Sequence, residues 1–296
     1  MAGLSYDHLD FPENNDLAPF SSAQRTEEQV SPKAGFYYTP LKDTTIRGAY
    51  TRSLGGLFYD GSVRLEPTQV GGFNQAFRSV IPESVVGLVP GSEFETFGLA
   101  LDQNFATGTY VSIAAEQLNS SARRSIGALD LQFLGPAIPS GIPDRIEFEE
   151  RSLTLSLHQL IGKHWSFGAS YRVTDADLSE HTSGLTPALA AAMDRDWEAT
   201  LHQVHLAGTV NLPCGFFASA GAVWSQQSNR GYSPDIPGDD FWQFNAYLGY
   251  RFLKRHAELR LGLLNIGDTN YRLNPLTLYS ELPRERTLAA RFQFGF

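Results

Sequence analysis

The histidines of this sequence are the residues best suited to acid–base or metal chemistry, and the chain has seven of them. His202 and His205 are three residues apart, so on an extended strand they point to opposite faces and cannot chelate one metal ion together. His158 follows Ser156 and Thr154 at alternate positions, and a Ser–His pair could begin a hydrolase site. No Gly-x-Ser-x-Gly elbow supports that chemistry. The sequence therefore predicts no catalytic residue and no enzyme activity, and a phospholipase-like barrel is the least favoured alternative.

Carboxylates gather in the segment Asp235–Asp240, which contains three aspartates. Carboxylate oxygens are the ligands that calcium prefers, but the segment lacks the spacing of a known calcium loop. We expect a solvated acidic turn there. The sequence predicts no metal site and no cofactor.

Arginines recur among small polar residues on several alternating segments, at positions opposite to the apolar ones. Charged side chains in a pore lumen line the path of an ionic solute or pair with opposite charges on neighbouring strands, such as Glu258. We favour pairing. The residues predicted to face the lumen are Arg172, Arg251, Arg260 and Arg291.

The elements that position these residues are strands in which apolar and polar residues alternate. In 242–252 one face carries aromatic and aliphatic residues, whereas the other carries polar or small residues. Most such segments are 10 to 14 residues long, enough for a tilted strand to cross a bilayer. The sequence predicts about twelve strands, at 1–10, 29–39, 45–54, 93–104, 108–121, 148–161, 165–177, 196–211, 216–228, 241–252, 257–270 and 286–296.

The connections between these strands alternate between short and long. Short turns such as 162–164 alternate with long segments rich in Pro, Gly, Asp and Ser, near 11–28, 55–92, 122–147, 178–195, 229–240 and 271–285. Short periplasmic turns and long outer loops are typical of outer-membrane barrels. The fold class predicted is an all-β, antiparallel, transmembrane outer-membrane β-barrel. A soluble β-sandwich is a weaker alternative, because it would carry mixed and charged outer faces.

One long connection differs from the others in composition. The segment Val70–Gly87 is unusually apolar for an outer loop. We expect it to fold into the lumen or to pack on the rim of the barrel.

Composition and charge are consistent with this fold class. Hydrophobic residues make up 42% of the 296 residues and charged residues 19%, and the net charge of −9 argues against a nucleic-acid partner. The single cysteine, Cys214, excludes an intramolecular disulfide. The N-terminal residues have no basic region and no apolar core, so we identify no secretory signal.

Aromatic residues gather near predicted strand ends, as in the interfacial girdles of membrane barrels. Examples are Trp165, Phe216, Trp224 and Trp242. The chain ends on an alternating strand with Phe292, Phe294 and Phe296 on one face. A terminal Phe on such a strand resembles the assembly signal of bacterial outer-membrane proteins. The expected partners are therefore outer-membrane lipid and the barrel-assembly machinery, and the expected location is the outer membrane.

The segment Gly262–Tyr271 resembles the penultimate strand and loop start of TonB-dependent receptors, which carry a Gly-x-x-Asn-hydrophobic-x-Asp-x-x-Tyr pattern. Upstream, Val30–Pro40 and Ile46–Ser53 resemble two strands of the same family, and Leu65–Pro67 is a partial match to a third motif. The resemblance implies uptake of a scarce solute (a siderophore, a vitamin or a glycan), with an energised TonB-type partner that displaces a plug.

The chain also departs from that family, which has a plug domain and a 22-stranded barrel. We expect residues 1–296 to form a single β-barrel domain, the C-terminal part of a larger barrel, with N-terminal strands, plug and signal peptide missing. A fragment of this kind should not form a stable native barrel by itself. The alternative is a pore or exporter-type barrel attached to a periplasmic repeat domain.

Overall fold

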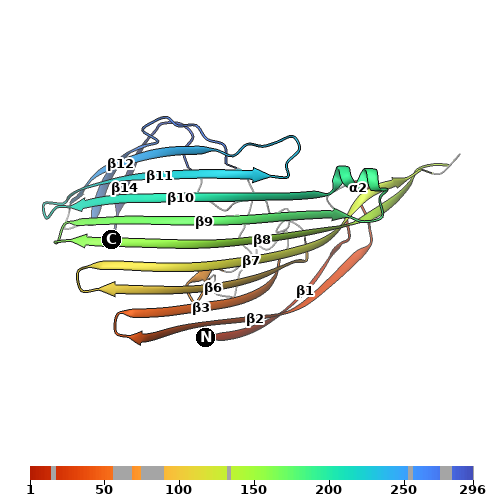
Figure 1. The fold of residues 1–296 in the computed structure, drawn as a ribbon, viewed down its shortest axis with the longest axis horizontal. Helices are drawn as coiled ribbons and strands as arrows, with labels where there is room; N and C mark the ends of the chain where they lie inside the picture. The colour runs from red at the N-terminus through yellow and green to blue at the C-terminus, as the bar shows by residue number, and fades with distance from the viewer. Residues whose placement is uncertain are drawn as a thin grey trace.

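The computed structural model describes residues 1–14, 18–55, 69–74, 90–131, 135–252, 256–273 and 282–295. It is dominated by one twelve-stranded antiparallel sheet whose strands follow one another in chain order. Figure 1 shows this sheet curled about its long axis, with the short turns at one end and the extended hairpins at the other. Among the described residues no pairing joins the first strand to the last, so the sheet has two open edges.

The strands of the large sheet are β1 (Ala2–Pro12), β2 (Gln24–Leu41), β3 (Thr44–Gly55), β6 (Ser92–Phe105), β7 (Thr109–Asp130), β8 (Ile138–Ile161), β9 (Trp165–Thr182), β10 (Arg195–Asn211), β11 (Phe216–Arg230), β12 (Asp240–Phe252), β13 (Ala257–Leu264) and β14 (Thr287–Phe294). Two further elements complete the described structure. One is a hairpin of two-residue strands, β4 (Gln69–Val70) and β5 (Phe73–Asn74), and the other is a short helix, α2 (Pro187–Met193). Within the described part of the chain, no helix has the length and apolarity needed to span a membrane.

All twelve predicted strands are confirmed, but several of their predicted ends are wrong. The segment 122–147 was expected to be a loop, yet most of it extends β7 and β8, which form a hairpin with strands of 22 and 24 residues. The strand expected over 257–270 ends at Leu264, because Asn265 adopts a left-handed conformation with φ of 48°.

The outward face of the sheet carries an apolar band bordered by aromatic residues. On β11 the band runs from Phe216 to Trp224, and on β12 from Tyr250 to Trp242. Eight residues at about 3.3 Å each span about 26 Å along a strand, or roughly 20 Å across the membrane at a tilt of about 40°. Trp224 packs against Trp242 with ring centroids 6.4 Å apart. This band matches the lipid-facing surface of a transmembrane barrel.

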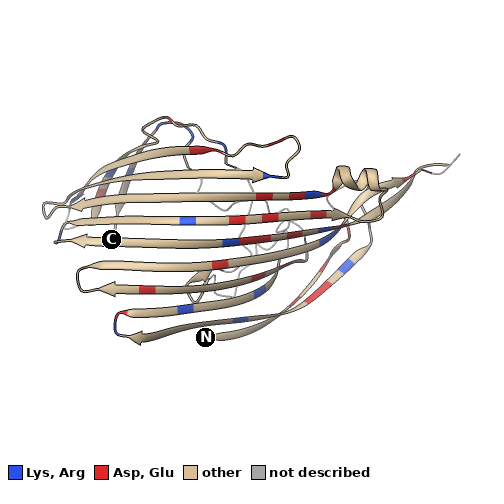
Figure 2. Cartoon of the chain, viewed as in Figure 1, with Lys and Arg blue, Asp and Glu red and all other residues tan. Residues whose placement is uncertain are grey.

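On the outward face, charged residues lie beyond this band, toward the long loops. In β10 and β11 every Lys, Arg, Asp and Glu is at the loop end, at Arg195, Asp196, Glu198 and Arg230. Figure 2 shows the same distribution: the parts of β10 and β11 near the short turns carry no charged residue. The uncharged part therefore lies in the membrane, and the charged ends of these strands project from it.

The inward face mixes polar with apolar side chains, and many of those on its loop-side half are buried. An apolar cluster lies on its loop-side half, formed by Phe94, Leu118, Ala122, Ile146, Phe148, Ala176, Leu178 and Ala199. Because side chains alternate along each strand, the polar residues between the members of this cluster point outward. The inward face is therefore the one that can position groups along a solute path.

Candidate solute path along the inward face

Arg251 lies on β12 and faces inward, where it is held by three neighbours. Its Nε donates to Glu258 Oε2 at 2.8 Å, and its Nη1 donates to Asn211 Oδ1 at 2.8 Å. The guanidinium lies over the Phe217 ring, 4.2 Å from the centroid. The Glu258 carboxylate on β13 neutralises Arg251, and the ion pair links the neighbouring strands β12 and β13.

The other three candidate arginines have different surroundings. Arg172 approaches Glu150 at 3.6 Å and donates to Ser152 at 3.3 Å. Arg260 lies over the Tyr247 ring at 3.8 Å, and in the register of β13 with β14 it faces Arg291.

Arg291 donates to Gln293 at 3.1 Å. Within the described ranges neither Arg260 nor Arg291 forms an ion pair with a carboxylate. The two therefore form a cationic pair near the short-turn end of the inward face. The function of the four predicted lumen-facing arginines stays untested, and pairing with opposite charges remains the role that we favour.

A second charge cluster lies on the inward face near the extended hairpins. Arg124 on β7 bridges Asp144 at 2.7 Å and Glu180 at 2.6 Å, and Arg195 approaches Glu180 at 3.2 Å. Thr182 donates to Asp144 at 3.2 Å. Sequence reasoning missed this cluster because all five of its residues lie in the segments 122–147 and 178–195, which were expected to be loops.

The family-like motif after β13 forms a hydrogen-bond network that fixes a loop. Asn265 is fully buried, and its side chain donates to the carbonyls of Thr269 at 2.9 Å and Pro283 at 3.1 Å. The same side chain accepts from the Thr269 backbone N–H at 2.8 Å. Gln243, also fully buried, donates to the same two carbonyls. The motif asparagine thus closes the turn and ties it to the segment before β14.

The remaining motif residues extend this network. The Tyr271 hydroxyl donates to the Leu282 carbonyl at 2.6 Å, and the same hydroxyl oxygen accepts the Leu282 backbone N–H at 3.1 Å. Asp268 accepts the Arg286 backbone N–H at 2.8 Å. The Tyr271 ring stacks on Phe241, 4.8 Å between centroids. These contacts are structural, and they bring the loop over the inward side of β12.

A second loop segment also lies against the inward face, and it was only partly anticipated. The β4–β5 hairpin buries Val70 and Phe73, which are 1% and 3% exposed. A Cβ at Gly35 would lie 2.7 Å from Val70, and a Cβ at Gly98 would lie 2.5 Å from the Phe73 ring. Of the two expected positions for 70–87, the structure places 70–74 on the inward face. Residues 75–87 lie outside the described residues.

The histidines and the acidic turn contact other protein groups. His202 accepts or donates a hydrogen bond at 2.7 Å with the Tyr171 hydroxyl on the outward face, whereas His205 points inward. Within the described ranges no hydrogen bond joins a histidine to a serine hydroxyl, and no three His, Cys, Asp or Glu residues could share a metal ion. The lack of enzyme activity remains a prediction.

In the acidic segment, Asp239 accepts the Arg272 N–H at 2.6 Å, and Asp240 accepts from the Trp224 ring at 2.7 Å. Two of the three carboxylates of this turn, those of Asp239 and Asp240, are therefore engaged with protein donors.

Outside the membrane, one carboxylate fixes the loop between β9 and β10. Asp194 accepts the Thr182 backbone N–H at 2.9 Å and faces the His181 ring nitrogen at 2.8 Å. These two donors, the backbone amide foremost, hold the pKa of the Asp194 carboxyl below its usual range. The carboxylate therefore holds the two ends of this loop together at neutral pH.

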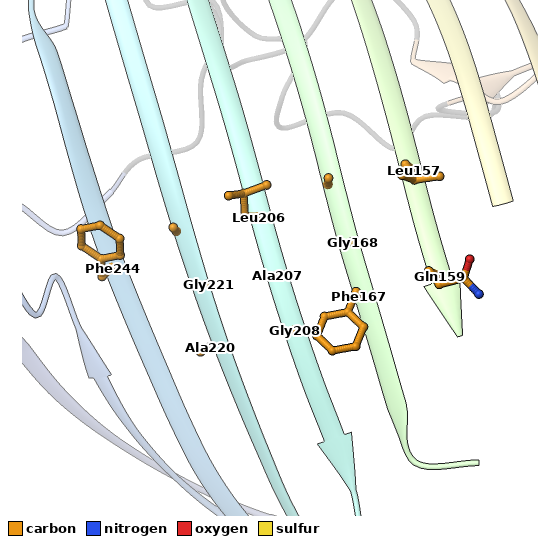
Figure 3. Close-up of a pocket in the computed structure, with 12 residues that line it drawn as sticks. Leu157, Gln159, Phe167, Gly168, Leu206, Ala207, Gly208, Ala220, Gly221 and Phe244 are labelled. Carbon is orange, nitrogen blue, oxygen red and sulfur yellow. The ribbon is translucent and has the colours of Figure 1, made fainter. Parts of the chain in front are cut away.

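An apolar recess opens on the outward face across β8 to β12. Figure 3 shows Leu157, Phe167, Leu206 and Phe244 around positions that carry only glycine or alanine. Its volume is about 510 Å³. Because it lies within the apolar band, this recess faces acyl chains and is not part of the solute path.

The proposed assembly signal lies on the last strand. Phe292 and Phe294 are exposed on the outward face of β14, and Phe292 packs against Phe252 at 6.4 Å. Phe296 lies outside the described residues.

No protein-family model matches this chain, and no curated protein sequence matches it closely. Solved structures do match its fold. A chain of the FpvAI–pyocin S2 complex is 13% identical, with a TM-score of 0.55, over 81% of this chain and 34% of that one. Pseudomonas aeruginosa FpvA bound to heterologous pyoverdines is 13% identical, with a TM-score of 0.51, over 81% of this chain and 35% of that one.

The chain spans about a third of the length of the FpvA structures that it matches. At this identity the likeness describes the fold alone. Together with the apolar outward band, it defines the class of this protein: an antiparallel outer-membrane β-barrel wall, located in the outer membrane.

Proposed function

We propose that this chain is part of a TonB-dependent receptor-like barrel that takes up a scarce solute across the outer membrane. The observation that carries the proposal is the loop network built on Asn265, Asp268 and Tyr271. Its sequence resembles that of TonB-dependent receptors, and it holds an outer loop on the inward face, where a captured solute would pass. The likeness of the wall to FpvA supports the same proposal.

Open sheet edges add a second argument. β1 pairs only with β2 and β14 only with β13 among the described strands. Unpaired N–H and C=O groups are untenable in lipid, so both edges need further strands in the membrane. A larger barrel in the natural protein would supply them, and the prediction that residues 1–296 alone form no stable native barrel rests on this point.

The test begins with the genomic reading frame upstream of Met1. A signal peptide, a plug and about ten further strands are expected for a receptor. The complete protein should then restore uptake of at least one iron–siderophore, vitamin or glycan from a panel in a deletion strain, and loss of the TonB-type transducer should abolish it. Uptake that persists without the transducer would contradict the proposal.

The alternative of an exporter-type barrel makes a different prediction for the same reading frame. Periplasmic helical repeats would stand upstream, and deletion would cause retention of a product in the periplasm. The arginine pair Arg260 and Arg291 leaves this alternative open, because an inward cationic pair is equally compatible with an anionic polymer.

The last strand provides a test of the proposed assembly partner. Replacing Phe292 and Phe294 with Ala should slow folding of the protein into the outer membrane, because the C-terminal strand would be read less well by the barrel-assembly machinery. Pulse–chase labelling with a folding-dependent gel shift measures the rate. The pair Leu259→Ala/Leu261→Ala, exposed on the outward face of the neighbouring strand, serves as the control. Equal delays in both pairs would argue against an end-specific signal.

A further inference from the structure

The inward face carries a row of small residues at the height where the β4–β5 hairpin lies. Gly35 on β2 is in register with Ala49 on β3, and Ala49 is in register with Gly98 on β6. These are all inward positions, because they alternate with outward residues such as Phe36 and Phe97. Gly35, Ala49 and Gly98 therefore leave a shallow recess across three adjacent strands, which we call the seat.

The hairpin fills this seat closely. Val70 lies on Gly35, and the Phe73 ring lies on Gly98. At the tip, Gly71 and Gly72 have φ of 58° and 83°, as a tight two-residue turn requires. A Cβ on Gly71 would be 2.6 Å from the Gly48 carbonyl oxygen, so only glycine allows this approach to the wall.

One arginine secures the lower side of the seat. Arg47 donates to Asp102 at 2.8 Å, which fixes its guanidinium, and the guanidinium lies 5.0 Å from the centroid of the Phe73 ring. Its Nη1 is also 3.5 Å from the Gly71 carbonyl. Asp102 thus neutralises the Arg47 guanidinium, and the guanidinium contacts the hairpin at Phe73 and Gly71.

The seat lies near the loop-side border of the apolar band. The outer loop leaves the wall at Gly55, where Gly91 N–H donates to the Gly55 carbonyl at 2.9 Å. Ala49 is six residues below that point, or about 20 Å along the strand. Gly98 pairs with Glu116, next to Gln117 near the top of the apolar band, so the hairpin lies at the outer border of that band.

We propose that the β4–β5 hairpin is a fixed constriction of the solute path that selects by size. Residues 69–74 contain no charged side chain, and the nearby charges of Arg47 and Asp102 satisfy each other. The constriction excludes solutes too wide to pass an apolar loop packed on the wall. The proposal rests on the barrel fold and needs neither TonB coupling nor a named ligand.

A disulfide tests the position of the hairpin. In a Cys214→Ser background, Gly35→Cys/Val70→Cys should form a disulfide under mild oxidation, because these side chains would be in direct contact. The control is Gly3→Cys/Val70→Cys, since a Cβ at Gly3 has no atom within 4 Å. Equal cross-linking of both pairs, or none at Gly35, would overturn the proposed position.

Thiol accessibility tests the function of the hairpin. Thr45→Cys places a reporter on the inward face below the seat, and Thr209→Cys places one near the short-turn end of the distant strand β10. In intact cells that express the complete protein, a small maleimide should label Thr45→Cys at least tenfold faster than a polyethylene-glycol maleimide.

Gly98→Leu, which displaces the Phe73 ring, should bring those two rates within about twofold, and it should also speed labelling of Thr209→Cys by the polyethylene-glycol maleimide, because Thr209 lies beyond the same constriction. Phe73→Ala, which only removes atoms, is a second variant that keeps the test valid if Gly98→Leu does not fold. Equal labelling by both reagents in the unmodified hairpin would overturn the constriction. Labelling of Thr45→Cys that stops when the hairpin is locked by the Gly35–Val70 disulfide would show a gate in its place.

Discussion

Two loop segments lie on the inward face of this wall, and they are held there by different chemistry. The hairpin at 69–74 is seated by close packing on glycines and by one aromatic–arginine contact. The loop at 265–273 is held by buried side chains that bond to backbone carbonyls. The first arrangement depends on the shape of three strands, whereas the second depends on the identity of a few polar residues.

This difference predicts how each region responds to substitution. A packed seat tolerates loss of atoms better than gain of atoms, because an added methyl group has no space. A buried hydrogen-bond network responds in the opposite way, because removing one partner leaves the others unsatisfied. The following substitutions test that contrast.

The largest effect is expected at Asn265. Asn265→Leu removes three side-chain hydrogen bonds in a fully buried position, so we expect the free energy of unfolding to fall by about 3 kcal/mol. Urea unfolding of the complete barrel in lipid vesicles measures this change. Asn270→Leu, at an exposed residue of the same loop, should cost less than about 1 kcal/mol. Similar losses at both sites would remove the distinction between the two asparagines.

Gly98→Ala should be the most sensitive small substitution in the seat. The added Cβ would be 2.5 Å from the Phe73 ring, and overpacking of this kind costs about 2 kcal/mol. Gly3→Ala adds the same group on the same face, where nothing lies within 4 Å, and it should leave the midpoint of unfolding unchanged. A neutral Gly98→Ala would mean that the hairpin is not packed on β6.

Tyr271→Phe should have a smaller effect than Asn265→Leu within the same network. It removes one hydroxyl that bonds to Leu282, for an expected loss of about 1 kcal/mol. Limited proteolysis of the 266–286 segment should become faster. Tyr247→Phe is the control, because the Tyr247 hydroxyl has no hydrogen-bond partner in the described ranges and its ring still faces Arg260. Protection that is unchanged in Tyr271→Phe would assign the anchoring to Asn265 alone.

The smallest effect is expected at Asp194, where a single carboxylate holds an outer loop. Because folding lowers the pKa of this carboxyl, its contribution is present at neutral pH and is lost as the pH falls through the folded-state pKa. Protease nicking of residues 183–194 should therefore increase in acid. Asp194→Asn should nick faster at pH 7 and show no such increase, whereas Asp235→Asn should behave like the parent protein.

The strands in the membrane were predictable because lipid on one side and lumen on the other impose strict alternation. That signal disappears where a strand leaves the bilayer, since both faces there meet polar surroundings. The segment containing Pro139, Gly141 and Pro143 was therefore expected to be a loop, although it pairs in regular register with β7. Strand length beyond the membrane depends on pairing, which local composition does not encode.

The two loop sites differ in the same way. The Asn265 motif was visible because its residues are close in sequence and act locally across one turn. The glycine seat was not visible, because Gly35, Ala49 and Gly98 become neighbours only through strand register. Apolarity of the 70–87 segment was the only available signal, and it did not distinguish the lumen from the rim.

The β7–β8 hairpin has a consequence for how this protein meets its surroundings. From Gln117, near the top of the apolar band, to Asp130 the strand advances about 43 Å, so at a tilt of about 40° its tip stands roughly 33 Å above the lipid. Leu131, at that tip, is 85% exposed. Exposed loop tips tolerate insertions, so an epitope inserted at this tip should be reached by an antibody on intact cells.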